Sequence, residues 1–183
     1  MFDEFIDILN NDLTVLKTCL KTEVHTYGHL HASVHIWFYT NDCKLLIQKR
    51  SSNKIAFPNL WDVSVAGHIS TGETSITGAI REVKEEIGLD ITANELLKIG
   101  SFKEQFQHKD DFTDNEIHHI YLCKLTKDIN LLKIQKEEVS QIKLIPIDEF
   151  KDQLKKHAFE NVFVPHYPEY YDFILTNIDK QVT

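Results

Sequence analysis

Residues 67–89 decide the fold of this chain, and they read GHISTGETSITGAIREVKEEIGL. From Thr74 onward, apolar side chains recur at helical spacing, and Gly88 is a residue type that ends helices in the left-handed conformation. The pattern therefore predicts a helix over residues 74–87. Its apolar side, which we expect to pack on a sheet, consists of Ile76, Ala79, Ile80, Val83 and Ile87.

A second side of this helix carries Glu82, Glu85 and Glu86, whose spacings of three and four residues make their carboxylates neighbours. Like charges at this spacing repel each other, and the repulsion grows where the site is partly buried. Carboxylates that converge on one turn suit a hard divalent cation, and Arg81 can orient one of them by a bidentate contact. The bland alternative is a solvated acidic face paired with Arg81 and Lys84.

At this point the stretch resembles the Nudix signature, Gly-x5-Glu-x7-Arg-Glu-U-x-Glu-Glu-x-Gly-U, in which U is a bulky aliphatic residue. The fixed positions hold Gly67, Glu73, Arg81, Glu82, Glu85, Glu86 and Gly88, and the U positions hold Val83 and Leu89. The resemblance implies an α/β (α+β) fold, a Nudix-like α/β/α sandwich with a central mixed β-sheet. We expect a single domain over residues 1–183, with an N-terminal hairpin at 3–20, a core at about 28–158 and a C-terminal helix at about 168–178.

The resemblance also implies a chemistry, the hydrolysis of a diphosphate linkage in a small molecule, usually a nucleoside diphosphate derivative. It implies that Mg²⁺ or Mn²⁺ is the cofactor, held by Glu82, Glu85 and Glu86 with help from the Gly67 carbonyl. In the family the general base is a glutamate of the helix or of a later loop, and Glu116 is the later candidate for base and metal ligand. Both alternatives stay open from the sequence.

The flanking residues resemble one branch of this superfamily, the type I isopentenyl-diphosphate isomerases and their hydrolase relatives. The similarity covers about residues 21–121 and includes Gln48-Lys49-Arg50-Ser51, Pro58-Asn59-Leu60-Trp61 and Asp114-Asn115-Glu116. It implies a second metal site formed by His25, His31, His68, Asp114 and Glu116. It also implies diphosphate binding by Lys21, Arg50 and Lys54. The alternatives are packing histidines and ordinary solvated cations.

Two departures favour phosphate chemistry over isomerisation. The isomerases need a cysteine directly before the Gly-His pair to move a proton on carbon, and here that position is Ala66. The isomerases also degrade the Arg-Glu-U-x-Glu-Glu core, which is intact here. Three function classes remain: a hydrolase, an isomerase-like enzyme, and a Nudix module that senses a nucleotide without turnover. The intact glutamates favour the hydrolase.

The bulk properties limit the partners. A net charge of −8 argues against a nucleic-acid polymer, which would need a basic surface. Only three cysteines are present and no apolar run approaches the roughly 20 residues of a membrane span. We therefore expect a cytoplasmic protein with a small-molecule diphosphate substrate and no membrane partner. A homodimer is an open alternative to a monomer, since dimers are frequent among Nudix-like proteins.

Period-two and period-3.6 patterns predict the remaining elements. We expect a hairpin from residues 4–9 and 13–16 and a second hairpin from 33–40 and 44–48. Further strands are expected at 61–66, 96–106, 117–125 and 142–145, with a polar loop at 108–115. Helices are expected at 148–156 and 169–178.

Overall fold

A computed structural model describes residues 4–156 and 161–182. In chain order the elements are β1 (Phe5–Leu9), β2 (Val15–Leu20), α1 (Lys21–Thr26), β3 (His31–Tyr39), β4 (Lys44–Arg50), β5 (Trp61–Asp62), β6 (Val65–His68), α2 (Ser75–Ile87), η1 (Ala93–Glu95), β7 (Leu96–Lys109), β8 (Phe112–Lys124), η2 (Ile129–Leu131), β9 (Val139–Pro146), α3 (Ile147–Leu154) and α4 (Pro168–Val182).

The strands form one mixed sheet, in which β3 is the central strand. β3 pairs antiparallel with β1, β4 and β6, and it pairs parallel with β8 from His31–Glu116 to Tyr39–Lys124. β7 pairs antiparallel with β8, and β9 with β4. The predicted mixed sheet is therefore confirmed.

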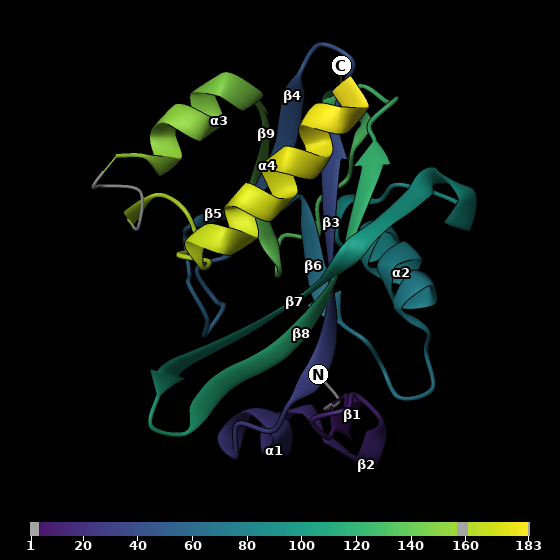
Figure 1. The fold of residues 1–183 in the computed structure, drawn as a ribbon, viewed down its shortest axis with the longest axis vertical. Coiled ribbons are helices and arrows are strands. Elements are labelled where there is room, and N and C mark those ends of the chain that lie inside the picture. Colours follow the sequence, from purple (N-terminus) through teal and green to yellow (C-terminus); the bar gives the residue numbers. More distant parts are fainter. Residues whose placement is uncertain (1–3, 157–160, 183) are drawn as a thin grey trace.

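Helices cover both faces of the sheet (Figure 1). On β3, Val34, Ile36 and Phe38 point to one face, where they pack with Ala79, Val83 and Ile87 of α2. Trp37 points to the other face and packs with residues of α3 and α4, among them Phe150 and Ile174. The alternation along one strand thus divides the core into two layers, which confirms the α/β/α sandwich.

Helix α2 begins and ends where the sequence predicts. Thr74 caps its N-terminus, because the Thr74 Oγ1 accepts a hydrogen bond from the Thr77 amide at 3.2 Å and the Thr77 hydroxyl accepts one from the Thr74 amide at 2.9 Å. Gly88 ends the helix with φ +66°, in the left-handed region. The caps fix the bounds of the helix, and the packing of its apolar side on the sheet fixes its rotation and therefore the direction of its glutamates.

The predicted polar loop over residues 108–115 is wrong. β7 continues to Lys109 and β8 begins at Phe112, so only Asp110 and Asp111 form the turn. Polar side chains on both faces of this hairpin hide the period-two apolar signal on which the prediction relied. Glu116 consequently lies within a strand.

Other predicted bounds need smaller corrections. The predicted strand over 61–66 is two strands, β5 and β6, and helix α1 was not predicted at all. α1 has only six residues, too few for a clear helical period. The N-terminal hairpin, the strand at β9 and both C-terminal helices are confirmed within a few residues. Within the described residues, no helix is both long and apolar enough to cross a bilayer.

Candidate active site

Glu82 and Glu86 of α2 point into a cavity of about 1120 Å³ that is also lined by strands β3 to β8. The Glu86 side chain is buried, and its Oε2 accepts hydrogen bonds from Gln48 Nε2 at 3.0 Å and from the Ala66 amide at 3.2 Å. Burial and then the neighbouring charge of Glu82 raise the pKa of Glu86 to about 8. Burial also raises the pKa of Glu82. Neighbouring carboxylates whose charged forms are disfavoured in this way provide oxygen ligands that suit a divalent cation.

Gly67 provides the space in which the Glu82 carboxylate lies. A Cβ added at Gly67 would overlap the carboxyl group of Glu82. Any other residue at this position would therefore displace the carboxylate. The close approach of backbone and carboxylate fits a cation shared by the Gly67 carbonyl and Glu82, which the family resemblance implies.

Arg81 holds the acidic turn together. Its Nε and Nη2 donate to both oxygens of Glu73 at 2.9 Å, and its Nη1 donates to Glu82 at 2.7 Å and to Glu85 at 3.0 Å. Nη2 also donates to the His68 carbonyl at 2.9 Å. The hydrogen bonds of Glu73, followed by the charge of Glu82, raise the pKa of Arg81. Arg81 is thus a positioning residue, while Glu85 remains half exposed.

The predicted histidines come together next to Glu116. The ligating nitrogens of His25, His31 and His68 lie within 4.8 Å of one another. Their Nε2 atoms are buried without a hydrogen-bond partner among the described residues, and those of His31 and His68 lie 3.4 Å from Glu116 Oε1. Asp114 Oδ1 lies 3.0 Å from His25 Nδ1. Buried, unpartnered nitrogens that converge beside a carboxylate fit a transition-metal ion.

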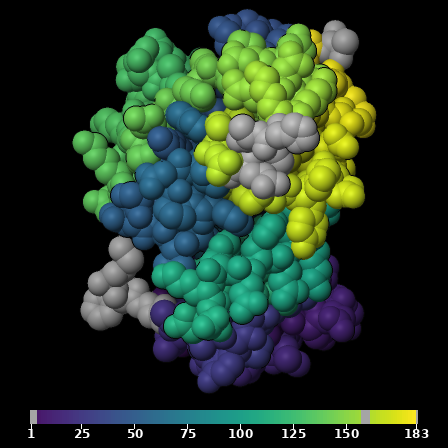
Figure 2. All heavy atoms as spheres, turned by 90° about the vertical axis from the view of Figure 1, so that its left-hand side faces the viewer, coloured from purple at the N-terminus to yellow at the C-terminus, as the bar shows by residue number. Residues whose placement is uncertain are grey.

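The three predicted cations line the same cavity. Arg50 Nη1 donates to Asp62 at 2.8 Å, Lys21 lies 3.5 Å from Glu4, and Lys54 forms an ion pair with Glu138. Each cation is therefore paired with a carboxylate, for which the phosphate oxygens of a ligand can compete. Two aromatic side chains line the same cavity as Lys54: Phe57 contacts Phe106 with ring centroids 5.3 Å apart. Figure 2 shows the chain around residues 50–60 beside the tip of the β7–β8 hairpin.

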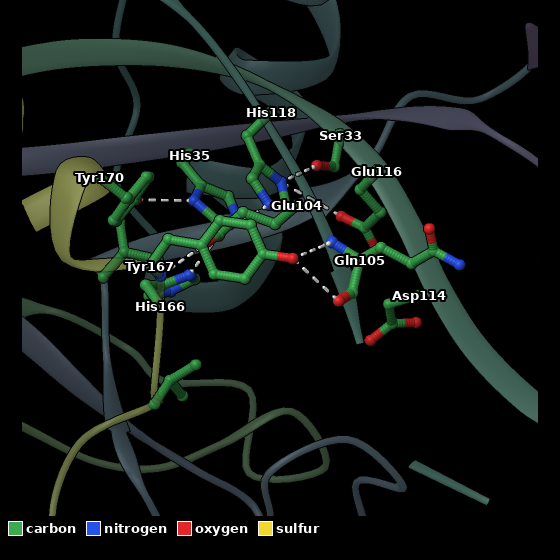
Figure 3. A network of polar contacts seen from close by, with 12 residues as sticks. Ser33, His35, Glu104, Gln105, Asp114, Glu116, His118, His166, Tyr167 and Tyr170 are labelled. Carbon is green, nitrogen blue, oxygen red and sulfur yellow. Dashed lines mark hydrogen bonds and ion pairs between the residues drawn. The ribbon is translucent and has the colours of Figure 1, made fainter. Parts of the chain in front are cut away.

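A buried polar network on the cavity wall was not predicted (Figure 3). It consists of Ser33, His35, Asp62, Glu104, His118, His166 and Tyr170. The sequence does carry a signal for part of it, because residues two apart in a strand share a face. His31, Ser33 and His35 are spaced in this way along β3. Glu116 and His118 are spaced in this way along β8. Glu104 and His166 carried no such signal, because only tertiary packing brings them there.

The electrostatics of this network are dominated by paired charges. Burial lowers the pKa of His118, but hydrogen bonds with Glu104 and Glu116 outweigh it and raise that pKa to about 9. Burial raises the pKa of Glu104, but His118 and His166 outweigh it and lower that pKa to about 2. Glu104 and His118 therefore balance each other's charge inside the protein.

Comparison with known proteins agrees with this architecture. A model of the NUDIX domain matches residues 29–167. The chain is 35% identical to an uncharacterized Nudix hydrolase of Clostridium acetobutylicum, over 96% of this chain and 97% of that one. It is 32% identical to an isopentenyl-diphosphate Delta-isomerase of Serratia proteamaculans, over 66% of this chain and 65% of that one.

The fold is shared with solved structures. A protein of Deinococcus radiodurans superposes with a TM-score of 0.64 at 21% identity, over 82% of this chain and 88% of that one. The domain match spans most of this chain, and the Clostridium relative covers nearly all of it. The chain therefore belongs to the Nudix hydrolases, enzymes that split diphosphate linkages.

Proposed function

We propose that this protein is a Mg²⁺- or Mn²⁺-dependent Nudix hydrolase that cleaves the diphosphate linkage of a nucleoside diphosphate derivative. The observation that carries the proposal is the pair of neighbouring carboxylates, buried Glu86 and partly buried Glu82, in a cavity that Lys21, Arg50 and Lys54 also line. The carboxylates can bind a divalent metal ion, and the Lys and Arg side chains in the same cavity can bind phosphate oxygens. A metal-bound diphosphate needs both kinds of group.

The acidic turn provides the ligands for the cation. Glu82, Glu86 and the Gly67 carbonyl would hold it, and Glu85 would join from the half-exposed side of the turn. When bound, such a cation polarises phosphoryl oxygens and makes a water more acidic. Arg81 keeps Glu82 and Glu85 in place, so that the carboxylates do not have to reorganise when substrate enters.

Lys21, Arg50 and Lys54 would bind the diphosphate. They reach the cavity from α1, β4 and the segment after β4, and exchange of their carboxylate partners for phosphate oxygens keeps each of these three cations paired. Phe57, Phe106 and Phe112 line the same cavity and can stack on a nucleobase. These aromatic side chains support a nucleoside as the organic part of the substrate.

We assign the general base to Glu85 or Glu86 rather than to Glu116. Glu116 Oε1 lies 3.4 Å from the Nε2 atoms of His31 and His68, and its Oε2 lies 3.2 Å from His118 Nδ1. Both oxygens are thus directed at imidazoles, and a base needs an oxygen free to reach water. Glu116 instead suits the second metal, together with His25, His31, His68 and Asp114.

A direct assay tests the hydrolase. Purified protein with Mg²⁺ or Mn²⁺ is incubated with a panel of nucleoside diphosphate derivatives and isopentenyl diphosphate, and products are followed by phosphorus NMR. We expect monophosphate products from a nucleoside diphosphate derivative. Migration of the double bond in isopentenyl diphosphate would identify an isomerase, although Ala66 offers no proton, and binding without turnover would identify a sensor.

Two variants localise the activity. Glu82→Gln should lower turnover by a factor on the order of 100 or more, because it removes one charged ligand from the cation. Glu137→Gln is the matched control, since Glu137 is an exposed glutamate outside the cavity lining. Equal rates for the two variants would contradict the assigned site.

A further inference from the structure

Three buried side chains converge on the cavity wall apart from the acidic turn and the histidine cluster. They are Glu104 of β7, His118 of β8 and His166 of the segment before α4, and all three are at most 7% exposed. One carboxylate and two imidazoles form a ligand set that suits Zn²⁺, Mn²⁺ or Fe²⁺. We propose that Glu104, His118 and His166 bind a transition-metal ion, with Zn²⁺ as the reference ion.

The ligand atoms already lie close to the spacing that such an ion needs. The candidate ligand atoms of the three residues lie within 4.8 Å of one another. Glu104 Oε2 is 2.6 Å from His166 Nδ1 and 3.2 Å from His118 Nε2. Bonds of about 2.0–2.1 Å in tetrahedral geometry separate ligand atoms by roughly 3.3 Å. Small side-chain movements would therefore open the site for an ion.

The outer contacts of these three side chains are those of metal ligands (Figure 3). His166 Nε2 lies 3.2 Å from Asp62, and His118 Nδ1 lies 2.7 Å from the Ser33 hydroxyl and 3.2 Å from Glu116. A metal-bound histidine almost always directs its second nitrogen to a carboxylate or another oxygen, which fixes ring and tautomer. Both histidines satisfy this rule independently.

The carboxylate is positioned in the same way. Glu104 Oε1 accepts a hydrogen bond from the Tyr167 amide at 2.6 Å, which leaves Oε2 directed at the two imidazoles. Protonated histidines paired with Glu104 would also direct both of their N–H groups at oxygen acceptors. The contacts therefore fit a metal ion or an ion-paired network, and the metal count described below separates the two.

The site would be open to ligands. Glu104, His118 and His166 all line the cavity, so three protein ligands leave at least one coordination position for a water or a ligand oxygen. The ion would replace the protons with which His118 and His166 balance the buried charge of Glu104, so its binding would release protons. Glu116 lies between this site and the histidine cluster, with one oxygen toward each.

The test counts bound ions and is independent of hydrolysis. The full chain is dialysed to equilibrium against Zn²⁺, and bound metal is measured by inductively coupled plasma mass spectrometry. His166→Gln should lose one equivalent of Zn²⁺ relative to His119→Gln. His119 is the matched control, because it neighbours His118 in sequence but does not line the cavity. Equal counts for these two variants would overturn the site.

A second experiment, in a variant that lacks one ligand of the histidine cluster, separates the two sites. His68→Gln removes a ligand of that cluster, and this variant should still bind Co²⁺ with the visible absorption of an imidazole-ligated ion. Adding Glu104→Gln to His68→Gln should abolish that absorption. If the single variant His68→Gln already lacks the band, the cluster accounts for all transition-metal binding and the proposal fails. Circular dichroism of each variant confirms that the fold is retained.

Discussion

Gly67 and Glu82 meet so closely that the site depends on the absence of a side chain at residue 67. Gly67→Ala would place a Cβ on the Glu82 carboxyl group, which is the end of a flexible side chain and can move away. We expect turnover to fall by a factor on the order of 100 while the melting temperature changes little, because the displaced carboxylate is a proposed metal ligand and not a core residue.

The matched control for this prediction is Gly78→Ala, also a glycine of the same region. Its Cβ would make only ordinary contacts, the nearest at 3.4 Å from Glu73, and Gly78 lies inside α2. Alanine in a helix interior stabilises by about 1 kcal/mol relative to glycine. Gly78→Ala should therefore keep its activity and melt higher. Unchanged kinetics in Gly67→Ala would show that Glu82 does not need its present position.

Glu86 should make the metal-free protein less stable as pH rises. Its pKa is about 8 in the folded protein against an ordinary value of 4.5, so between these values the folded state holds a proton that the unfolded state has released. Stability therefore falls with rising pH, by up to about 1.4 kcal/mol per pH unit. Urea unfolding in EDTA at pH 5 to 8 measures the slope.

Glu86→Gln supplies the control for that slope. The amide oxygen can still accept the hydrogen bonds from Gln48 and Ala66, but it does not titrate. Wild type should lose stability relative to this variant between pH 5 and pH 8 in EDTA, and saturating Mn²⁺ should remove the difference in slope. Parallel pH profiles in EDTA would contradict the buried, metal-seeking carboxylate.

Single residues also show what the sequence could predict of the site. The sequence predicts the helix and the proximity of Glu82, Glu85 and Glu86, because these depend only on helical spacing. Their role as metal ligands stays a prediction. Glu104 and His166 could not be predicted, since they are 62 residues apart and meet only through the packing of the segment before α4 on β7. Local patterns carry no information about such contacts.

At the level of elements, α2 depends on its C-terminal glycine. Gly88 has φ +66°, and an added Cβ would lie 2.9 Å from the Cβ of Lys133 and 3.1 Å from its carbonyl oxygen. Gly88→Ala should destabilise the protein by about 1–2 kcal/mol, since it combines left-handed strain with a contact to backbone. Thermal unfolding measures this, and a melting temperature equal to that of wild type would show that the cap contributes little.

The β7–β8 hairpin shows why some elements escaped prediction. Its outer half carries polar side chains on both faces, because one face meets solvent and the other lines a polar cavity. A strand with that environment has no apolar alternation, and its turn residues Asp110 and Asp111 were indistinguishable from a longer loop. The apolar side of α2 and the C-terminal half of β3, by contrast, face apolar layers and were predicted well.

At the scale of the whole molecule, Tyr170 joins the C-terminal helix to the centre of the sheet. Its hydroxyl lies 2.7 Å from His35 Nδ1 and accepts a hydrogen bond from Trp37 Nε1 at 3.0 Å, and the side chain is fully buried. Tyr170→Phe removes the hydroxyl that His35 and Trp37 contact, so it should lower the free energy of unfolding by about 1–3 kcal/mol. Urea unfolding checks it.

Tyr167→Phe is a suitable comparison, because within residues 4–156 and 161–182 the hydrogen bonds of the Tyr167 hydroxyl are exposed ones to the backbone of Gln105. Loss of the Tyr167 hydroxyl should lower the free energy of unfolding by well under half as much as loss of the Tyr170 hydroxyl, since water replaces exposed partners. Equal effects of the two substitutions would show that the buried contact to β3 has no special weight.

The whole account depends on a divalent cation between the acidic turn of α2 and Gly67. Crystals soaked in Mn²⁺ and measured for anomalous scattering test it most directly. We predict a manganese peak within bonding distance, about 2.2 Å, of the carboxylates of Glu82 and Glu86, absent in Glu82→Gln crystals. A map with no peak beside these two residues at saturating Mn²⁺ would contradict the account.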